Sequence, residues 1–400
     1  MLDTHSKASM KEFTILMASL MSVVAISIDA MLPALGFIGR DLGVENPNHV
    51  QLIIGCIFIG MAIGQLLCGP LSDAWGRKKV LYFGIAFYLI GSVMCYLADS
   101  FPILLIGRFI EGLGVAGPYV STISIVRDKY SGRDMAKVMS LVMMIFIMVP
   151  AIAPSLGQAI LLAASWRYIF LLYIFYSIAI GSWLYFRLEE TLHPEYRIPF
   201  KFKAIAHGFK EVIKNRVTIS YTVCMGICFG SFIGYLNSSR QIFQEQFGTG
   251  KMFTVYFGVL ALLFGISSLV NSRFVEKLGM RYICRRGTLL IIIASLIFLV
   301  INLAVQVQLW MFLVYAAILF FCFGLMFGNL NSIAMEPMGH IAGIASSVIG
   351  SLSTAISMVL GAIIGQLYNN TLIPITLGFL ILGALSLTAM HYGDRKIRGQ

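Results

Sequence analysis

Charged residues are scarce in this sequence, and their scarcity excludes a soluble protein of this length. Asp, Glu, Lys and Arg together make up 12% of the 400 residues, hydrophobic residues make up 58%, and the mean hydropathy is +0.87. Soluble domains carry about 25% charged residues, because water must solvate their surface. The composition therefore indicates an integral membrane protein.

Long hydrophobic runs, by contrast, are abundant. An α-helix needs about 20 mainly apolar residues to cross the hydrocarbon core of a bilayer. Twelve stretches meet this requirement, so the sequence predicts an all-α membrane protein with twelve transmembrane helices. The stretches are residues 13–35, 50–72, 80–98, 102–126, 137–160, 167–187, 217–239, 252–272, 287–304, 310–331, 341–365 and 371–391.

Positive charge is nearly missing from one side of the predicted membrane protein. With both termini in the cytoplasm, 24 of the 29 Lys and Arg residues fall in cytoplasmic loops or helix ends. Arg40, Arg167, Arg240 and Lys251 would lie outside, and Arg108 would lie within a span. This distribution follows the positive-inside rule, so we expect both termini to be cytoplasmic. It also explains the net charge of +11 without a nucleic-acid partner.

Groups for catalysis or metal binding are missing from the predicted spans. All six histidines lie near span ends or in loops, and no Ser/His or Cys/His arrangement occurs within the membrane. Cys224 and Cys228 share a helix face, but no histidine or acid joins them to form a metal site. No repeated filter segment or ring of charges suggests a channel. We therefore expect neither an enzyme nor a channel, and no metal or cofactor.

Ionisable residues deep in a span occur only in the first half. Asp29 lies in a long apolar run, and Arg108 and Glu111 are i, i+3 neighbours in another. An aspartate in such a run is costly and predicts a functional site, although it could instead reach headgroup water. Asp29 and Arg108 each lie roughly 9 Å from the outer side, so they could pair, with Glu111 about one turn deeper. Such a pair could be purely structural, but three ionisable groups favour a water-accessible cavity.

The chain repeats itself once at low similarity. Phe274–Arg281 overlays Leu71–Lys78 at an offset of about 203 residues, half the chain. Two parallel halves related by an axis along the membrane normal produce such an offset. We therefore expect a six-helix half at 1–187, a cytoplasmic linker at 188–216 and a second six-helix half at 217–400.

Aromatic residues take the place of charge in the second half. The positions that match Asp29 and Arg108 fall near Phe232 and Met311. Aromatic side chains suit greasy or aromatic substrates, although packing against lipid or other helices explains them as well. The candidate substrate-cavity residues are Met31, Tyr119, Phe229, Phe232, Tyr235 and Asn237.

The linker 188–216 is the longest polar stretch. Its basic part, 200–216, has apolar residues at helical spacing, which suits an amphipathic helix on anionic lipid of the cytoplasmic leaflet. A plain charged linker is the alternative.

Two further motifs concern helix ends and helix packing. The charged turn Gly69–Lys79 joins two hydrophobic helices and predicts a fixed arrangement of their ends. Pro150, Pro154 and Gly157 lie in one span, where proline removes a backbone donor and small residues let a neighbour approach. Ordinary membrane-helix packing would also accommodate these prolines.

Taken in order, these motifs resemble the Bcr/CflA branch of the drug:H+ antiporters, which are twelve-span major facilitator transporters of the bacterial inner membrane. The resemblance rests on Asp29 followed by Pro33-Ala34-Leu35, on the turn Gly69–Lys79, on Arg108 with Gly112 and Gly114, on Pro150, Pro154 and Gly157, and on Met335-Glu336-Pro337 with Ala342–Ser347. It implies alternating access between two halves and export of drugs such as bicyclomycin and chloramphenicol in exchange for protons.

The resemblance also implies roles for individual residues. Asp29 would carry the proton and Arg108 would tune it, because burial and an opposite charge shift a carboxyl pKa in opposite directions. Glu111 stands where the family has glutamine, and it either titrates as well or neutralises Arg108. Pro150–Gly157 would bend the fifth helix at the interface between the halves.

For the turn, the resemblance implies a latch of Gly69, Asp73, Gly76, Arg77 and Asp128. Asp73 would face the start of the span 341–365, and Arg77 would reach Asp128. The second copy, with Glu276 as its acid, would do a reduced version of the same.

We therefore expect a proton-coupled multidrug exporter that acts as a monomer on small, largely apolar compounds, with the proton as coupling ion. The alternative is a transporter of the same fold for one metabolite, as an exporter or a proton symporter. One departure stands out, because Gly36 replaces the proline with which the family commonly ends Leu-Pro-Ala-Leu-Pro.

Overall fold

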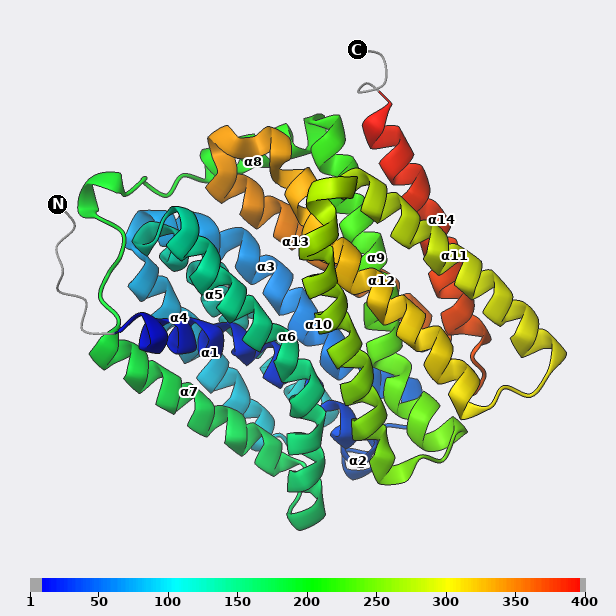
Figure 1. Ribbon diagram of the computed structural model, residues 1–400. Helices are drawn as coiled ribbons and strands as arrows, with labels where there is room; N and C mark the ends of the chain where they lie inside the picture. The colour runs from blue at the N-terminus through cyan, green and yellow to red at the C-terminus, as the bar shows by residue number, and fades with distance from the viewer. Residues whose placement is uncertain (1–8, 396–400) are drawn as a thin grey trace.

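The computed structural model describes residues 9–395, apart from the side chains at positions 132, 133, 136, 140, 147, 204 and 251. Within this range the secondary structure is helical throughout, with no strand (Figure 1). The predicted all-α class is therefore confirmed.

The first half contains six spans. The first span is broken into α1 (Met10–Asp29), the 3₁₀ turn η1 (Leu32–Ala34) and the short α2 (Leu35–Asp41). After the turn η2 (Pro47–Gln51), the other five are α3 (Leu52–Trp75), α4 (Arg77–Tyr96), α5 (Phe101–Lys129), α6 (Gly132–Ala163) and α7 (Arg167–Arg187).

The linker contains the turn η3 (Pro194–Tyr196) and the helix α8 (Phe202–Lys214). The second half then contains α9 (Arg216–Arg240), the π-helical turn η4 (Gln241–Gln246), the turn η5 (Gly250–Met252), α10 (Phe253–Leu278), α11 (Met280–Ala304), α12 (Leu309–Met335), the turn η6 (Glu336–Ile341), α13 (Ala342–Gln366) and α14 (Ile373–Asp394).

Twelve crossings account for these helices. Eleven helical stretches of the described residues are long and apolar enough to cross a membrane, and one of them is Leu309–Gln366, with 58 residues. At 1.5 Å per residue this stretch would measure about 87 Å, far more than one crossing of a core roughly 30 Å thick. Pro337 and the non-helical backbone of Met338 (φ −105°, ψ 15°) divide it at η6 into α12 and α13.

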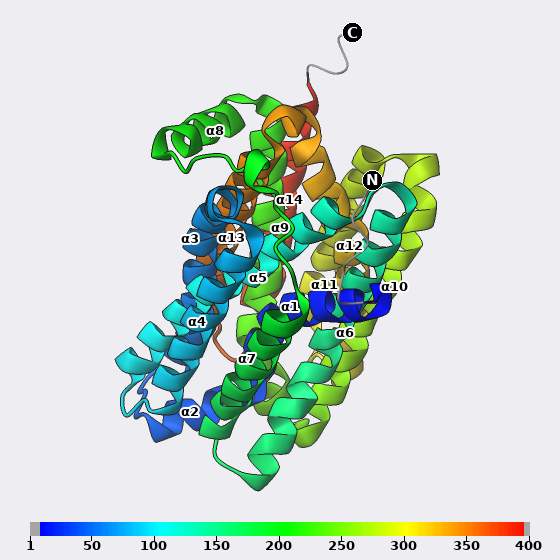
Figure 2. The same ribbon diagram turned by 90° about the vertical axis from the view of Figure 1, so that its left-hand side faces the viewer.

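The two halves lie side by side and share a common interface. Blue to green helices occupy one side of Figure 1 and green to red helices the other. The halves meet where α3 packs against α13 and α6 packs against α10. The start of α1, the helix α8 and the end of α14 lie on one face of the bundle, and Figure 2 shows α8 outside the spans.

The predicted repeat extends to the backbone of the turns. Gly76 between α3 and α4 has φ 104°, and Gly279 between α10 and α11 has φ 79°. These positions are separated by the predicted offset of about 203 residues. A positive φ of this kind is readily adopted only by glycine, so both turns depend on it.

Candidate functional site

Arg108 and Glu111 form a fully buried ion pair on α5. Arg108 Nη1 lies 2.6 Å from one carboxylate oxygen of Glu111, and Ser92 Oγ of α4 donates to the other at 2.7 Å. Arg108 also donates to the backbone oxygens of Ser27 and Ile53, at 2.8 and 3.3 Å. Both carboxylate oxygens of Glu111 therefore have a partner, and the pair is internally neutral.

Asp29 is the last residue of α1 and is only 5% exposed. Its carboxylate forms no hydrogen bond or ion pair with the described part of the chain. It lies within electrostatic reach of the Tyr235 hydroxyl on α9 and of Tyr173 on α7. Asp29 is thus a buried carboxyl group near the interface between the halves.

The Asp29–Arg108 pair that equal depths allowed therefore does not form in this structure, where Arg108 pairs with Glu111. The helices α1 and α5 do pack together, as the equal depths required. The Ser27 hydroxyl, however, bonds to Tyr88 of α4 at 2.7 Å, and a residue two positions later on a helix points about 200° away. Glu111, one turn along the same helix as Arg108, reaches the guanidinium instead.

The first span breaks directly after Asp29, and α6 packs against this break. Pro33 is the second residue of η1, where its missing N–H costs no helical hydrogen bond. A Cβ atom at Gly157 of α6 would lie 1.9 Å from the carbonyl oxygen of Ala30, so only glycine fits there. The proline motif thus lies beside Asp29, and α6 continues as one helix through Pro150 and Pro154.

The same stretch of α6 contacts the second half. The carbonyl oxygen of Ala151 lies 2.9 Å from the position of a Cβ atom on Gly258 of α10. Small residues thus bring the two backbones close at the interface between the halves.

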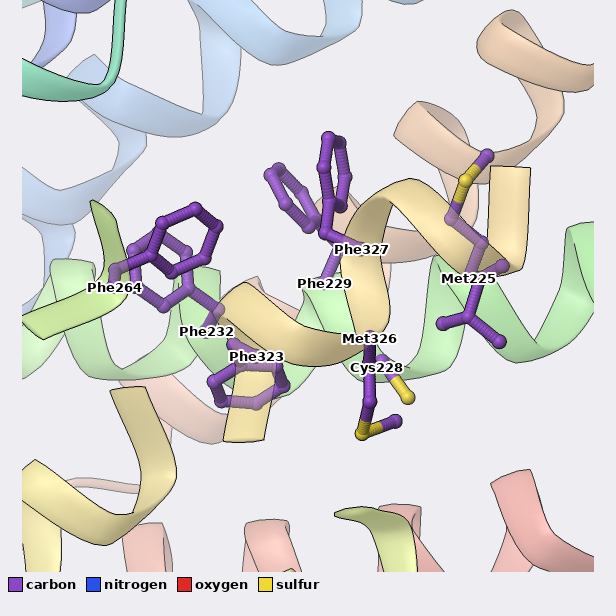
Figure 3. Close-up of a pocket in the computed structure, with 9 residues that line it drawn as sticks. Met225, Cys228, Phe229, Phe232, Phe264, Phe323, Met326 and Phe327 are labelled. Atoms are coloured by element: carbon purple, nitrogen blue, oxygen red, sulfur yellow. The ribbon is translucent and has the colours of Figure 1, made fainter. Parts of the chain in front are cut away.

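An apolar pocket lies within the second half, between α9, α10 and α12 (Figure 3). Its cavity volume is only about 10 Å³, room for about one water molecule, and no polar atom is exposed in it. Its lining residues are Met225, Cys228, Phe229, Phe232, Phe264, Phe323, Met326, Phe327 and Leu330. Its walls are aromatic and sulfur-containing side chains. In this conformation they fill the space, so the pocket is too small for a drug-sized molecule.

Of the predicted cavity residues, Phe229 and Phe232 line this pocket, and Tyr235 contacts the Phe232 ring at 6.4 Å between centroids. Met31 is buried in the turn after Asp29, and Asn237 donates to the carbonyl oxygen of Gly361. Tyr119 lies on α5 of the first half. The structure therefore does not gather these six residues into one cavity.

The α12 side of the pocket was missed by sequence reasoning. Phe323, Met326 and Phe327 stand in an apolar helix without polar contrast, so periodicity gives them no distinguishing signal.

The turn Gly69–Lys79 forms the contacts that the resemblance implied. Arg77 Nε donates to Asp128 at 2.8 Å, and Arg77 Nη1 donates to Asp73 at 2.5 Å. An oxygen of Asp73 lies 3.0 Å from the position of a Cβ atom on Gly343, in the first turn of α13. Gly69 lies so close to the Ser347 hydroxyl that a Cβ atom there would approach it to 1.8 Å.

Glu190 of the linker also holds this turn, and sequence reasoning missed it. Its carboxylate accepts from the backbone N–H groups of Arg77 and Lys78, at 2.9 and 3.2 Å, at the start of α4. Ile198 N–H donates to the backbone oxygen of Asp73 at 3.0 Å. An acid favours a helix N-terminus, but the 113 residues between Glu190 and Arg77 hide the pairing from local patterns.

The second half has its own ionic cluster, built from other acids than predicted. Arg281 pairs with Glu336 at 2.7 Å and with Asp394 at 3.3 Å, and Arg285 pairs with Asp394 at 2.6 Å. The expected acid, Glu276, is exposed and forms no ion pair within residues 9–395. Acids at the ends of α12 and α14 thus replace it.

A family profile described as the Major Facilitator Superfamily matches residues 16–362. The chain is 29% identical over 365 residues to "Uncharacterized MFS-type transporter YdgK" of Bacillus subtilis (strain 168), with 90% of each chain covered. It is 26% identical over 348 residues to "Bicyclomycin resistance protein homolog" of Haemophilus influenzae, with 87% of each covered. It is 30% identical over 383 residues to "Multidrug resistance protein MdtL" of Escherichia coli O157:H7, with 94% of this chain and 95% of the relative covered.

Solved structures share the fold at low sequence identity. The partially occluded, inward-open xylose transporter XylE of E. coli superposes with a TM-score of 0.74 at 13% identity, covering 96% of this chain and 98% of that one. The human organic anion transporter MFSD10 superposes with a TM-score of 0.70 at 15% identity, covering 96% of this chain and 100% of that one. The chain therefore belongs to the major facilitator superfamily and, within it, to the Bcr/CflA branch of the drug:H+ antiporters.

Proposed function

We propose that this protein is a proton-coupled multidrug exporter in which Asp29 carries the proton. The observation that supports this most directly is the contrast between two buried carboxylates. Glu111 is matched by Arg108 and Ser92, whereas Asp29 has no charged or hydrogen-bonding partner among the described residues.

A carboxylate without a counter-charge is costly in a dry environment and is well solvated in water. Asp29 lies at a helix break near the interface between the halves, where alternating access would change its surroundings. A movement of the halves that opens Asp29 to water on one side and then on the other would take up a proton and release it. Proton flow would thereby be coupled to the movement of the halves.

Arg108 and Glu111 act in this proposal as a fixed, neutral pair. Of the two roles open for Glu111, the geometry supports neutralisation, because both its carboxylate oxygens are occupied. The pair also ties α5 to the carbonyl oxygen of Ser27 on α1, two residues before Asp29. It therefore holds the helix that ends in Asp29.

The substrates in this proposal are small, largely apolar compounds. The small cavity beside α9 is walled by aromatic and thioether side chains with no exposed polar atom. If the transport cycle opens this cavity, such walls favour burial of apolar rings over recognition of one polar metabolite. The relatives named for multidrug and bicyclomycin resistance support the same class.

We further propose a bacterial inner-membrane location with both termini in the cytoplasm, no cofactor, and action as a monomer. The charge distribution supports the orientation. On α8, Phe202, Phe209 and Ile213 are exposed beside exposed lysines, which supports contact with anionic lipid.

Replacement of Asp29 tests the proposal. In proteoliposomes with an imposed pH gradient, uptake of radiolabelled chloramphenicol by the Asp29→Asn variant should fall to the level of empty liposomes. The reason is that the asparagine amide, unlike a carboxyl group, cannot take up and release a proton. The matched control is Asp99→Asn, the same change at an exposed loop residue, which should transport as the wild type does.

Transport by Asp29→Asn at the wild-type rate and with the wild-type pH response would overturn the assignment. Size-exclusion profiles and thermal unfolding of both variants show whether the protein is folded. A parallel panel of drugs and metabolites identifies a substrate if chloramphenicol is not one.

A further inference from the structure

Arg240, the last residue of α9, lies directly against Gly36 of α2. A Cβ atom at Gly36 would lie 2.0 Å from Arg240 Nη2 and 2.1 Å from Cζ. Any side chain at position 36 would therefore displace the guanidinium from its present place. This contact gives a physical reason for glycine where the resembling family commonly has proline.

Arg240 is buried, with 9% of its surface exposed. Its Nη1 pairs with Glu245 at 2.8 Å, and its Nε is buried without a hydrogen-bond partner among the described residues. Glu245 is half exposed and belongs to the π-helical turn η4, a rare geometry that is frequent at functional sites. An incompletely satisfied buried cation suits a contact that must open and close.

Side-chain amides join the halves next to this contact. Gln51 at the end of η2 donates to Gln241 of η4 at 2.8 Å, and Gln241 donates to Asn48 at 2.8 Å. Asn48 and Gln366 of α13 exchange two hydrogen bonds, at 3.1 and 2.8 Å. These hydrogen bonds between uncharged groups connect the two halves on the face away from α8 (Figure 1). Each contributes little net free energy, so the halves can separate there at low cost.

The position of Arg240 relative to Asp29 gives this closure an electrostatic role. Gly36 follows Asp29 in the same span, beyond the helix break and toward the face away from α8. Tyr235, within reach of Asp29, precedes Arg240 on α9. A fixed cation on the outer side of Asp29 repels protons that approach from that side, as arginines do in pores that exclude them.

We propose that Arg240, seated on Gly36, is the outer gate of this transporter. In the closed state it holds the outer ends of α2 and α9 together and excludes external protons from Asp29. Opening moves the guanidinium off Gly36 while its bond to Glu245 is kept. The electrostatic part rests on the proposed proton coupling, whereas the steric part stands without it.

Hydrogen–deuterium exchange of the full-length protein in lipid nanodiscs tests the steric part. The peptide covering 36–51 should exchange about tenfold faster in Arg240→Gln and in Gly36→Ala, because both changes remove the packing of the guanidinium on Gly36. Gly36→Ala keeps the charge and only displaces the side chain, so it provides a second variant if Arg240→Gln folds poorly.

Two matched controls should leave this exchange unchanged. Arg273→Gln removes an exposed arginine in the last turns of α10, and Gly55→Ala adds a methyl group only 3.4 Å from Met358 Cε, an ordinary contact. Unchanged exchange in both gate variants, or an equal increase in the controls, overturns the proposed gate.

Passive proton entry into substrate-free proteoliposomes, followed with an internal pH dye, tests the electrostatic part. Arg240→Gln should leak several-fold faster than the wild type and Arg273→Gln. If hydrogen–deuterium exchange becomes faster but proton leak does not, the proposed exclusion of protons is overturned and the steric gate is retained. If Asp29→Asn leaves transport intact, the proposed coupling fails, and the exchange measurement still decides whether the gate exists.

Discussion

At the scale of single residues, the two buried acids of the first half differ in what surrounds them. Glu111 has a cation and a hydroxyl within 2.7 Å, and Asp29 has neither within the described residues. Removing one member of a fully buried ion pair leaves the other charge uncompensated, which is costly, whereas removing both is often tolerated. The same carboxyl chemistry thus serves structure at one position and, in our proposal, transport at the other.

Replacement of Glu111 should therefore affect stability more than coupling. We expect Glu111→Gln to lower the free energy of unfolding by about 3 kcal/mol, because Arg108 stays buried with a neutral partner. Thermal unfolding in detergent measures the loss, and the double variant Arg108→Met/Glu111→Met should recover most of it. A large shift of the pH optimum of transport in Glu111→Gln would instead assign it a proton-carrying role.

At the scale of helices, the turn Gly69–Lys79 joins elements from three parts of the chain. Arg77 binds Asp128 of α5, Glu190 of the linker caps α4, and Asp73 faces the start of α13. The last contact places a negative charge at a helix N-terminus, where unpaired N–H groups favour it. It joins the two halves, so it must change whenever the ends of the halves on this side separate.

Asp73→Asn should consequently slow the transport cycle without altering which compounds are carried. Removing the charge weakens the α13 contact and the bond to Arg77, each by about 1 kcal/mol. Initial rates measured across a drug panel would show a uniform decrease, and a selective change for some drugs at unaltered turnover would argue against the latch.

The sequence predicts well the features that depend on local composition or on a recognised motif. The twelve spans, the glycine turns and the Arg77–Asp128 contact follow from runs, periodicity and the motif-based resemblance. Equal depths allowed an Asp29–Arg108 pair that the structure does not contain, because depth along a helix does not determine the direction in which a side chain points around it. Glu190, Asp394 and the Gly36–Arg240 contact depend on residues far apart in the chain, for which one sequence carries no distance signal.

At the scale of the whole molecule, α8 extends the protein beyond its spans. Ile205 and Val212 are buried, and Gly208 packs against Ile344 of α13, whereas Phe202 is 72% exposed. One face of α8 is thus held by the second half and another is left for the lipid headgroups.

The lysines of α8 should make the protein responsive to lipid charge. Replacing Lys203, Lys210 and Lys214 by glutamine removes about 1 kcal/mol of attraction to anionic lipid per residue. The wild type should unfold at a higher temperature in nanodiscs rich in phosphatidylglycerol than in phosphatidylcholine, and the triple variant should not distinguish them. The corresponding arginine variant should behave like the wild type, and a lipid response that persists in the glutamine variant would argue against this contact.

The ionic cluster of the second half has a genetic consequence. Its central acid, Asp394, is the last residue of α14, and it serves Arg281, Arg285 and the Tyr221 hydroxyl together. A premature stop codon at position 394 would leave every apolar segment in place and would look harmless in a hydropathy plot. It would nevertheless remove the carboxylate that pairs with both Arg281 and Arg285. A nonsense mutation this late in the gene should therefore be classified as damaging.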